Sequence, residues 1–180
     1  MMTDPRRRRF IVLNATGGIL VLASYAWGAL ASPDTMGSLW GGVPVGIQPV
    51  YTVNMLLSAA GYFLFAPYIA LRVDTDRADV LGRFDYSIFG VMMFGLVMIP
   101  SALWLPLTSL MLSDPSSWLW AVIRVDLALV GIGSVGLFLA LWSLKSPHAP
   151  GRAMALLGLV PFCIQTALLD ALIWPAYFAN

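Results

Sequence analysis

The chain has few charged side chains and few of the residue types that usually bind metals or act as nucleophiles. Only 11% of its 180 residues are charged, all nine acidic residues are aspartate, and cysteine and histidine occur once each. One cysteine, Cys163, excludes disulfide frameworks, zinc clusters and CxxC redox chemistry within a single chain. A net charge of +1 argues against nucleic acid as a partner.

Catalytic motifs are missing as well. The only histidine, His148, lies outside every long apolar run, which excludes a haem held by two histidines within the membrane and a Ser–His–Asp triad there. No HExxH, GxGxxG or P-loop pattern occurs. The sequence therefore favours a protein that is not an enzyme, without excluding one.

Apolar residues dominate instead. They make up 59% of the chain, and the mean hydropathy is +0.83. Five segments exceed the roughly 20 residues that cross a bilayer. They are 10–30, 49–71, 86–111, 118–144 and 153–178. We expect one all-α domain over residues 1–180, an integral membrane bundle of five transmembrane helices that Pro100, Pro106 and Pro161 kink without ending.

The basic residues indicate an orientation. Arginines 6–9 precede the first segment, and the other basic residues outside the runs lie in the connections 72–85 and 145–152, while 31–48 and 112–117 hold none. The positive-inside rule then places the N-terminus in the cytoplasm and the C-terminus outside. An alternative is a signal peptide ending at Ala29-Leu30-Ala31. Its apolar stretch of about 20 residues exceeds the usual 7–15, so we expect an uncleaved first helix.

Three charged residues lie inside the apolar runs: Arg124, Asp126 and Asp170. A charge at that depth costs roughly 2.5–3.5 kcal/mol, so such a residue is expected to pair, face a cavity or line a path. Arg124 and Asp170 fall at similar depth, which predicts an interhelical ion pair. Asp126 lies about 200° round the helix from Arg124 and should face another neighbour. A purely structural ion pair is the alternative to a functional role.

Polar and aromatic residues share helix faces, mostly in the outer half of each segment. These faces are Asn14, Gly17, Ser24 and Gly28; Tyr51, Asn54, Ser58, Gly61 and Phe65; Ser101, Trp104 and Thr108; and Phe162, Thr166, Asp170 and Trp174. On the first helix, and at glycines 131, 133 and 136 with Ser134, small residues predict close helix packing. Elsewhere we expect a cavity toward the outer side, covered by loop 31–48 with Trp40.

Three stretches are similar to motifs of the TspO/MBR family, the tryptophan-rich sensory and translocator proteins. Residues 49–52 (PVYT) resemble its P-V-W-T segment, 101–107 (SALWLPL) its N-x-x-W-x-P-L motif, and 160–174 its P-Y-x-x-W and terminal segment. Tyr51 stands where the family has tryptophan and Ser101 where it has asparagine. The loop signature W-x-P-P is absent.

The resemblance implies a homodimeric binder of a tetrapyrrole- or sterol-like ligand under the first loop. Arg124 would meet a ligand carboxylate, and haem would bind through its ring and propionates or weakly through Met or Tyr. The candidate ligand-binding residues are Trp40, Tyr51, Asn54, Ser101, Trp104, Arg124, Asp126, Thr166, Asp170 and Trp174. The alternatives are an accessory or structural subunit of a larger membrane complex, and a small transporter whose charged residues line a path.

Overall fold

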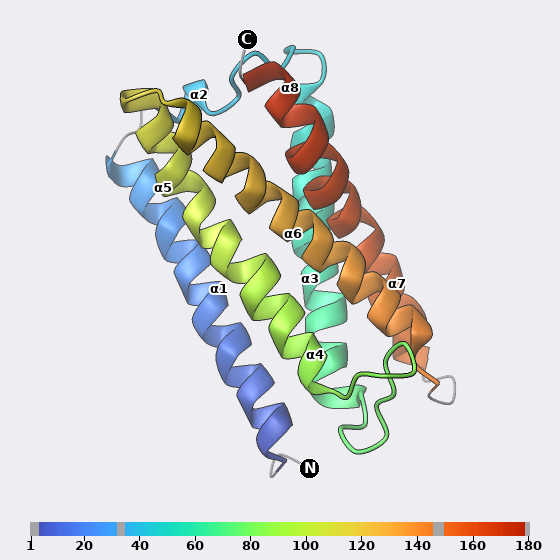
Figure 1. Ribbon diagram of the computed structural model, residues 1–180. Helices are drawn as coiled ribbons and strands as arrows, with labels where there is room; N and C mark the ends of the chain where they lie inside the picture. Colours follow the sequence, from blue (N-terminus) through green and yellow to red (C-terminus); the bar gives the residue numbers. More distant parts are fainter. Residues whose placement is uncertain (1–3, 32–34, 146–149, 179–180) are drawn as a thin grey trace.

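The computed structural model describes residues 4–31, 35–145 and 150–178, and within them five long helices lie side by side (Figure 1). Each is long and apolar enough to cross a membrane. They run over Pro5–Leu30, Gln48–Arg72, Ser87–Ser113, Ser117–Ser143 and Gly151–Phe178. The expected all-α five-helix membrane bundle is confirmed, with helix ends a few residues from their predicted positions.

Several of these helices are built from shorter elements. The first is α1 (Pro5–Ala31), the second α3 (Gln48–Arg72) and the fourth α6 (Ser117–Ser143). The third joins α4 (Ser87–Gly90), the π-helix η1 (Val91–Met98) and α5 (Ile99–Ser113). The fifth joins α7 (Pro150–Cys163), the π-helix η2 (Ile164–Ile173) and α8 (Trp174–Phe178). A short helix, α2 (Thr35–Ser38), lies in the first loop.

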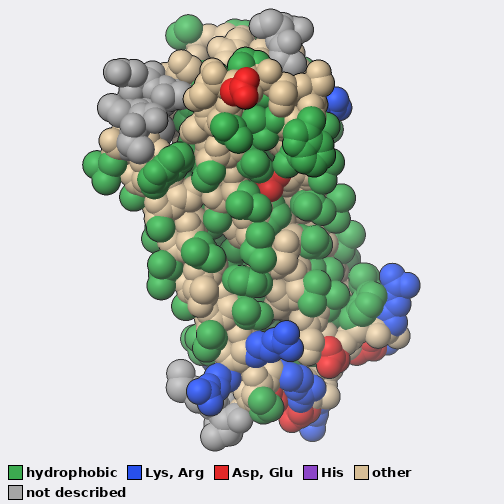
Figure 2. All heavy atoms as spheres, turned by 60° about the vertical axis from the view of Figure 1, so that its left-hand side comes forward, with side chains coloured by type: hydrophobic (Ala, Val, Ile, Leu, Met, Phe, Trp, Pro, Cys, Tyr) green, Lys and Arg blue, Asp and Glu red, His purple; other side chains and the backbone are tan. Residues whose placement is uncertain are grey.

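The two ends of the bundle differ in chemistry. The start of α1, the connection 73–86, the end of α6 and the start of α7 lie at one end, where Lys and Arg side chains gather (Figures 1 and 2). We call this the basic end. The opposite end, which holds α2 and α8, we call the aromatic end. His148 lies outside the described residues.

The two π-helical segments were not expected, and both lie next to prolines. Pro100 has no N–H, so the carbonyl of Leu96 in η1 loses its usual helical donor. At η2, the carbonyl of Pro161 accepts hydrogen bonds from Asn54 Nδ2 (3.0 Å) and Ser58 Oγ (2.8 Å). Side chains that occupy backbone carbonyls perturb the α-helical ladder, which accounts for the wider turns that follow.

Small residues bring the helices into close contact. A Cβ on Gly17 would collide with Met98, and one on Gly28 would collide with Leu105, so this face of α1 packs against η1 and α5 as predicted. Gly131, Gly133 and Gly136 of α6 pack in the same manner against η2 and η1. The helix α6 is the central one. Half of the residues in its most apolar 18-residue stretch are buried, against 11% in the corresponding stretch of α1.

At the basic end, side chains tie the start of α1 to the end of α3. Arg7 donates to the carbonyls of Ala70 and Val73, the latter over 2.9 Å from Nη2. The carboxylate of Asp4 accepts from Thr75 Oγ1 (2.7 Å) and from the Arg6 side chain (3.3 Å). Further along, Asn14 Nδ2 donates to the Tyr62 hydroxyl (2.7 Å). Helices α1 and α3 are therefore joined in their basic halves.

Candidate functional site

A cluster of aromatic side chains fills the aromatic end of the bundle. Its members come from the first loop and from α3, α5, α6 and α8, and they surround the apolar side chains of Leu119, Ile123 and Leu169. We call the ring-bearing members the aromatic cluster. They are Trp40, Tyr51, Trp104, Trp120, Trp174, Tyr177 and Phe178.

Trp174 is the centre of this cluster. Its ring stacks on Phe178 with centroids 4.3 Å apart and meets the edge of Trp104 at 5.9 Å. Trp120 lies 6.0 Å from it on the opposite helix. On the outside of Trp104, Tyr25 of α1 stacks at 6.2 Å. The rings stack on one another, and Trp174 is only 4% exposed.

The first loop closes over the cluster, at the place where the sequence predicts a cavity covered by loop 31–48; the two cavities described in the structure lie at the basic end. Trp174 Nε1 donates to the carbonyl of Leu39 over 2.9 Å, and Gly42 N donates to the carbonyl of Tyr177 over 3.2 Å. Trp40 packs edge-on against Tyr51 with centroids 5.9 Å apart. Residues 32–34 of this loop lie outside the described part of the chain. These two hydrogen bonds to α8 thus hold the loop in place and require no ligand.

A chain of polar side chains runs beneath the loop, between α3 and η2. Asn54 Nδ2 donates to Gln165 Oε1 (3.1 Å), and Gln165 Nε2 donates to Asp170 Oδ1 (2.8 Å). The Tyr51 hydroxyl donates to the carbonyl of Leu169 (3.0 Å). Asp170 is also close enough to the phenol groups of Tyr25 and Tyr51 to interact with them electrostatically. Gln165 was not among the predicted site residues, although it joins two of them.

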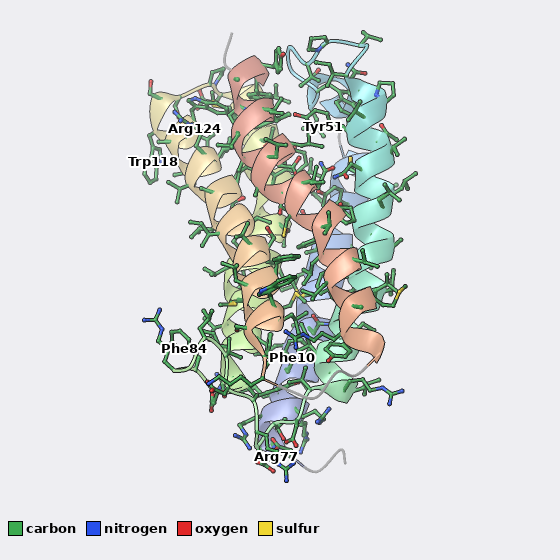
Figure 3. All side chains as sticks on the ribbon, turned by 90° about the vertical axis from the view of Figure 1, so that its right-hand side faces the viewer. Phe10, Tyr51, Arg77, Phe84, Trp118 and Arg124 are labelled. Carbon is green, nitrogen blue, oxygen red and sulfur yellow. The ribbon has the colours of Figure 1, made fainter. Side chains whose placement is uncertain are left out.

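The predicted Arg124–Asp170 ion pair is wrong. No ion pair in the described part of the chain involves Arg124, whose side chain is exposed, and Asp170 is bonded to Gln165 instead. Figure 3 shows Arg124 and Trp118 at the aromatic end of α6, away from Tyr51. The expected similarity in depth of Arg124 and Asp170 does not determine the direction in which each side chain points around its helix. In the structure, α6 buries Asp126 and exposes Arg124.

Asp126 is the least satisfied polar residue of this region. It is 6% exposed, and its Oδ2 atom has no hydrogen-bond partner among the described residues. On α5, the indole Nε1 of Trp104 and the hydroxyl of Thr108 are also buried and unpaired. Unpaired buried polar atoms are rare in native proteins, and each asks for an explanation such as a bound ligand or water.

Helix pairing puts Asp126 and Trp104 at one level. Gly133 of α6 lies against Leu96 and Val97. Because α5 and α6 run in opposite directions, counting seven residues from Gly133 to Asp126 on α6 corresponds to counting seven from Val97 to Trp104 on α5. At 1.5 Å per residue, this level lies about 14 Å below the start of α6. An unpaired acceptor and an unpaired donor thus share one layer of the bundle.

The remaining predicted residues have structural surroundings. Thr166 Oγ1 donates to Ser134 Oγ (2.6 Å), which joins η2 to α6. Ser101 is half-buried on α5. Four predicted residues lie in the aromatic cluster and two in the polar chain, and Asp126 is buried at the level of Trp104. They are Trp40, Tyr51, Trp104 and Trp174; Asn54 and Asp170; and Asp126.

The region holds aromatic rings, hydrogen-bonding groups and the carboxyl groups of Asp126 and Asp170. Among the described residues no group of three or more His, Cys, Asp or Glu side chains could hold a metal ion. In comparisons with known proteins, the chain matches no protein-family model, no curated protein and no solved structure.

Proposed function

We propose that the protein binds a flat, apolar small molecule, sterol-like or tetrapyrrole-like, within the aromatic cluster. The observation that carries this proposal is the pair of unsatisfied atoms, Asp126 Oδ2 and Trp104 Nε1, in one layer beside stacked rings. Small-molecule sites in proteins have this composition: mostly apolar and aromatic walls with a few convergent polar groups. The stretches that resemble the TspO/MBR motifs lie at the same end of the bundle.

A sterol-like ligand suits these two atoms well. Its hydroxyl group would donate to Asp126 Oδ2 and accept from Trp104 Nε1, which would satisfy both, while its ring system lies against Trp174. A tetrapyrrole could stack on the same rings, but its propionates would find no positive charge beside Asp126 and Asp170. They would have to point outward, toward the exposed Arg124.

The test is equilibrium binding of a fluorescent sterol and of metal-free protoporphyrin to the purified protein, followed through the ligand's own fluorescence. Trp104→Phe keeps a ring and removes the N–H, and Asp126→Leu removes the acceptor. Each should weaken sterol binding by about tenfold, the equivalent of one net hydrogen bond. Trp118→Phe, at a tryptophan that is 75% exposed, is the matched control for both probes, and Arg124→Leu is a control for the sterol alone.

Binding that all four variants leave unchanged would place the ligand elsewhere, and no saturable binding of either probe would reject the proposal. A sterol analogue without its hydroxyl separates the two contributions. The analogue should bind the unaltered protein more weakly than the sterol does. It should bind the Asp126→Leu variant with the same affinity as the sterol.

A second candidate function, transport of a proton or cation, is favoured by one specific observation. Neither Asp126 nor Asp170 forms an ion pair among the described residues. Carboxyl groups within membrane helices often mark proton or cation paths. Proteoliposomes that contain a pH-sensitive dye would report such a flux. Asp170→Asn should abolish it and Arg124→Leu should not, whereas vesicles without flux would exclude this function.

A further inference from the structure

A groove at the basic end, far from the aromatic cluster, has a different chemistry. Its volume is about 500 Å³, and it lies between α1 and the α4–η1 segment. Along α1 it extends from Pro5 to Leu13, about 12 Å at the helical rise. Its apolar wall is formed by Phe10, Leu13, Val91 and Phe94.

Glycines keep this groove open. A Cβ on Gly95 would meet nothing within 4 Å, and one on Gly90 would meet only Leu13, at 3.9 Å. Deeper along the same pair of helices, Gly17 packs directly on Met98. Helices α1 and η1 are therefore in tight contact at that level and leave space between them toward the basic end.

The mouth of the groove carries positive charge. Arg6 and Arg9 both line it, together with the exposed Ser87. Arg6 is engaged by Asp4 and Asp76. Arg9 is exposed, and none of the ion pairs in the described part of the chain includes it. A cation without a counter-ion among the described residues thus lies at the mouth of an apolar groove on the flank of a membrane helix.

We propose that this groove binds one anionic phospholipid, with the phosphate at Arg9 and an acyl chain along Phe10, Leu13 and Gly95. The reasons are charge complementarity and position. The groove lies on the most lightly covered helix, α1, where its surroundings are the bilayer. Basic side chains next to membrane helices attract anionic lipids. This proposal does not depend on the function proposed above.

The experiment is native mass spectrometry of the detergent-solubilised protein with equal amounts of phosphatidylglycerol and phosphatidylcholine that carry the same acyl chains. The unaltered protein should retain phosphatidylglycerol in preference. Arg9→Gln should lower that retention about fivefold, the contribution of one arginine near the surface. Arg77→Gln changes the same charge at a side chain that is 89% exposed at this end and should lower it less than twofold.

A second pair of variants tests the groove itself. Gly95→Leu should fill it and reduce retention of both lipids, whereas Gly18→Leu adds the same side chain to α1 where a Cβ also meets nothing. Equal retention of the two lipids, equal losses for Arg9→Gln and Arg77→Gln, or no effect of Gly95→Leu would each overturn the site. Arg9 is exposed, so its variant tests the proposal even if Gly95→Leu does not fold.

Discussion

Asp126 is buried with one carboxyl oxygen unpaired among the described residues. Burying it therefore lowers the free energy of unfolding, and no hydrogen bond to that oxygen offsets the loss. Replacing Asp126 by leucine should raise the free energy of unfolding by about 1–3 kcal/mol, the cost of an unsatisfied buried polar group. Arg124→Leu, at an exposed position on the same helix, should stay within about 0.5 kcal/mol. Unfolding in detergent, followed by circular dichroism, measures both. A marked loss of stability for Asp126→Leu would mean that the carboxyl has a structural partner.

Asn54 should behave in the opposite way, because its amide joins two helices. Asn54→Leu removes the bonds to Gln165 and Pro161, which are worth roughly 0.6 kcal/mol each on average within membranes, and leaves acceptors unpaired. We expect a loss of about 1–2 kcal/mol. Thr52→Ala, at an exposed residue of α3 that bonds only within its own helix, is the control. A loss as small as that control's would show that solvent or neighbouring groups replace the amide.

At the level of single residues, the sequence predicted depth better than direction. Helical spacing placed Trp104, Trp174 and Tyr51 together at one end, and the structure confirms that they share a cluster. The same spacing paired Arg124 with Asp170 because it could not show which way α6 turns. Gln165 was missed because it lies one position off the stripe of Thr166 and Asp170, and the wider turns of η2 bring it to face Asp170.

The contact between α3 and α7 depends on two glycines that face each other. A Cβ on Gly61 would collide with the carbonyl of Gly158, and one on Gly158 would lie 2.7 Å from the carbonyl of Gly61. Gly61→Ala should therefore separate the helices and cost about 1–3 kcal/mol, because backbone cannot move aside cheaply. Gly18→Ala, in open space on α1, should instead gain up to about 1 kcal/mol from helix propensity. If both variants shift stability alike, close approach at Gly61 is not limiting.

The start of α1 should be sensitive to acid. The hydroxyl of Thr75, with help from Arg6, lowers the pKa of Asp4 below its ordinary value of 3.8. A carboxyl with a lowered folded-state pKa stabilises the fold above its unfolded pKa, and this contribution is lost as pH falls through the folded value. The unfolding temperature should therefore drop below about pH 4. Asp4→Asn and Thr75→Val should both flatten that drop, and Thr52→Ala should not. A profile identical for all four proteins would show that Asp4 does not control it.

The five spanning elements were predictable because length and apolar composition determine them, whereas the π-helices were not. Proline positions indicated where the ladder would be interrupted, but the response to the interruption depends on partners from other helices. At Pro161, those partners are Asn54 and Ser58, more than a hundred residues earlier in the chain. Contacts between residues so far apart cannot be predicted from the local sequence. The register of the fifth helix, and with it the position of Gln165, is therefore known only from the structure of the whole bundle.

The molecule as a whole is polarised along its long axis. All described arginines except Arg124 lie at one end, together with the proposed lipid groove, and rings with unpaired polar atoms lie at the other. The bundle is rigidly tied at the basic end by Arg7 and Asp4, while the aromatic end is closed by a loop that rests on α8. Under the proposed function, a ligand would therefore enter past the loop, and the basic end would anchor the protein in the leaflet.

This polarity also predicts the orientation in the membrane. All basic residues outside the five predicted apolar runs lie at one end, so we expect that end in the cytoplasm and the first loop outside. In a Cys163→Ser background, Gly46→Cys places a thiol on the first loop, where a Cβ meets nothing, and Asp79→Cys places one at the basic end. A membrane-impermeant maleimide added to intact cells should label Gly46→Cys only, and Asp79→Cys should become labelled after permeabilisation. The reverse pattern would place the aromatic cluster on the cytoplasmic side. Labelling of both thiols in intact cells would mean that the chain inserts in two orientations, whereas the distribution of basic residues predicts one.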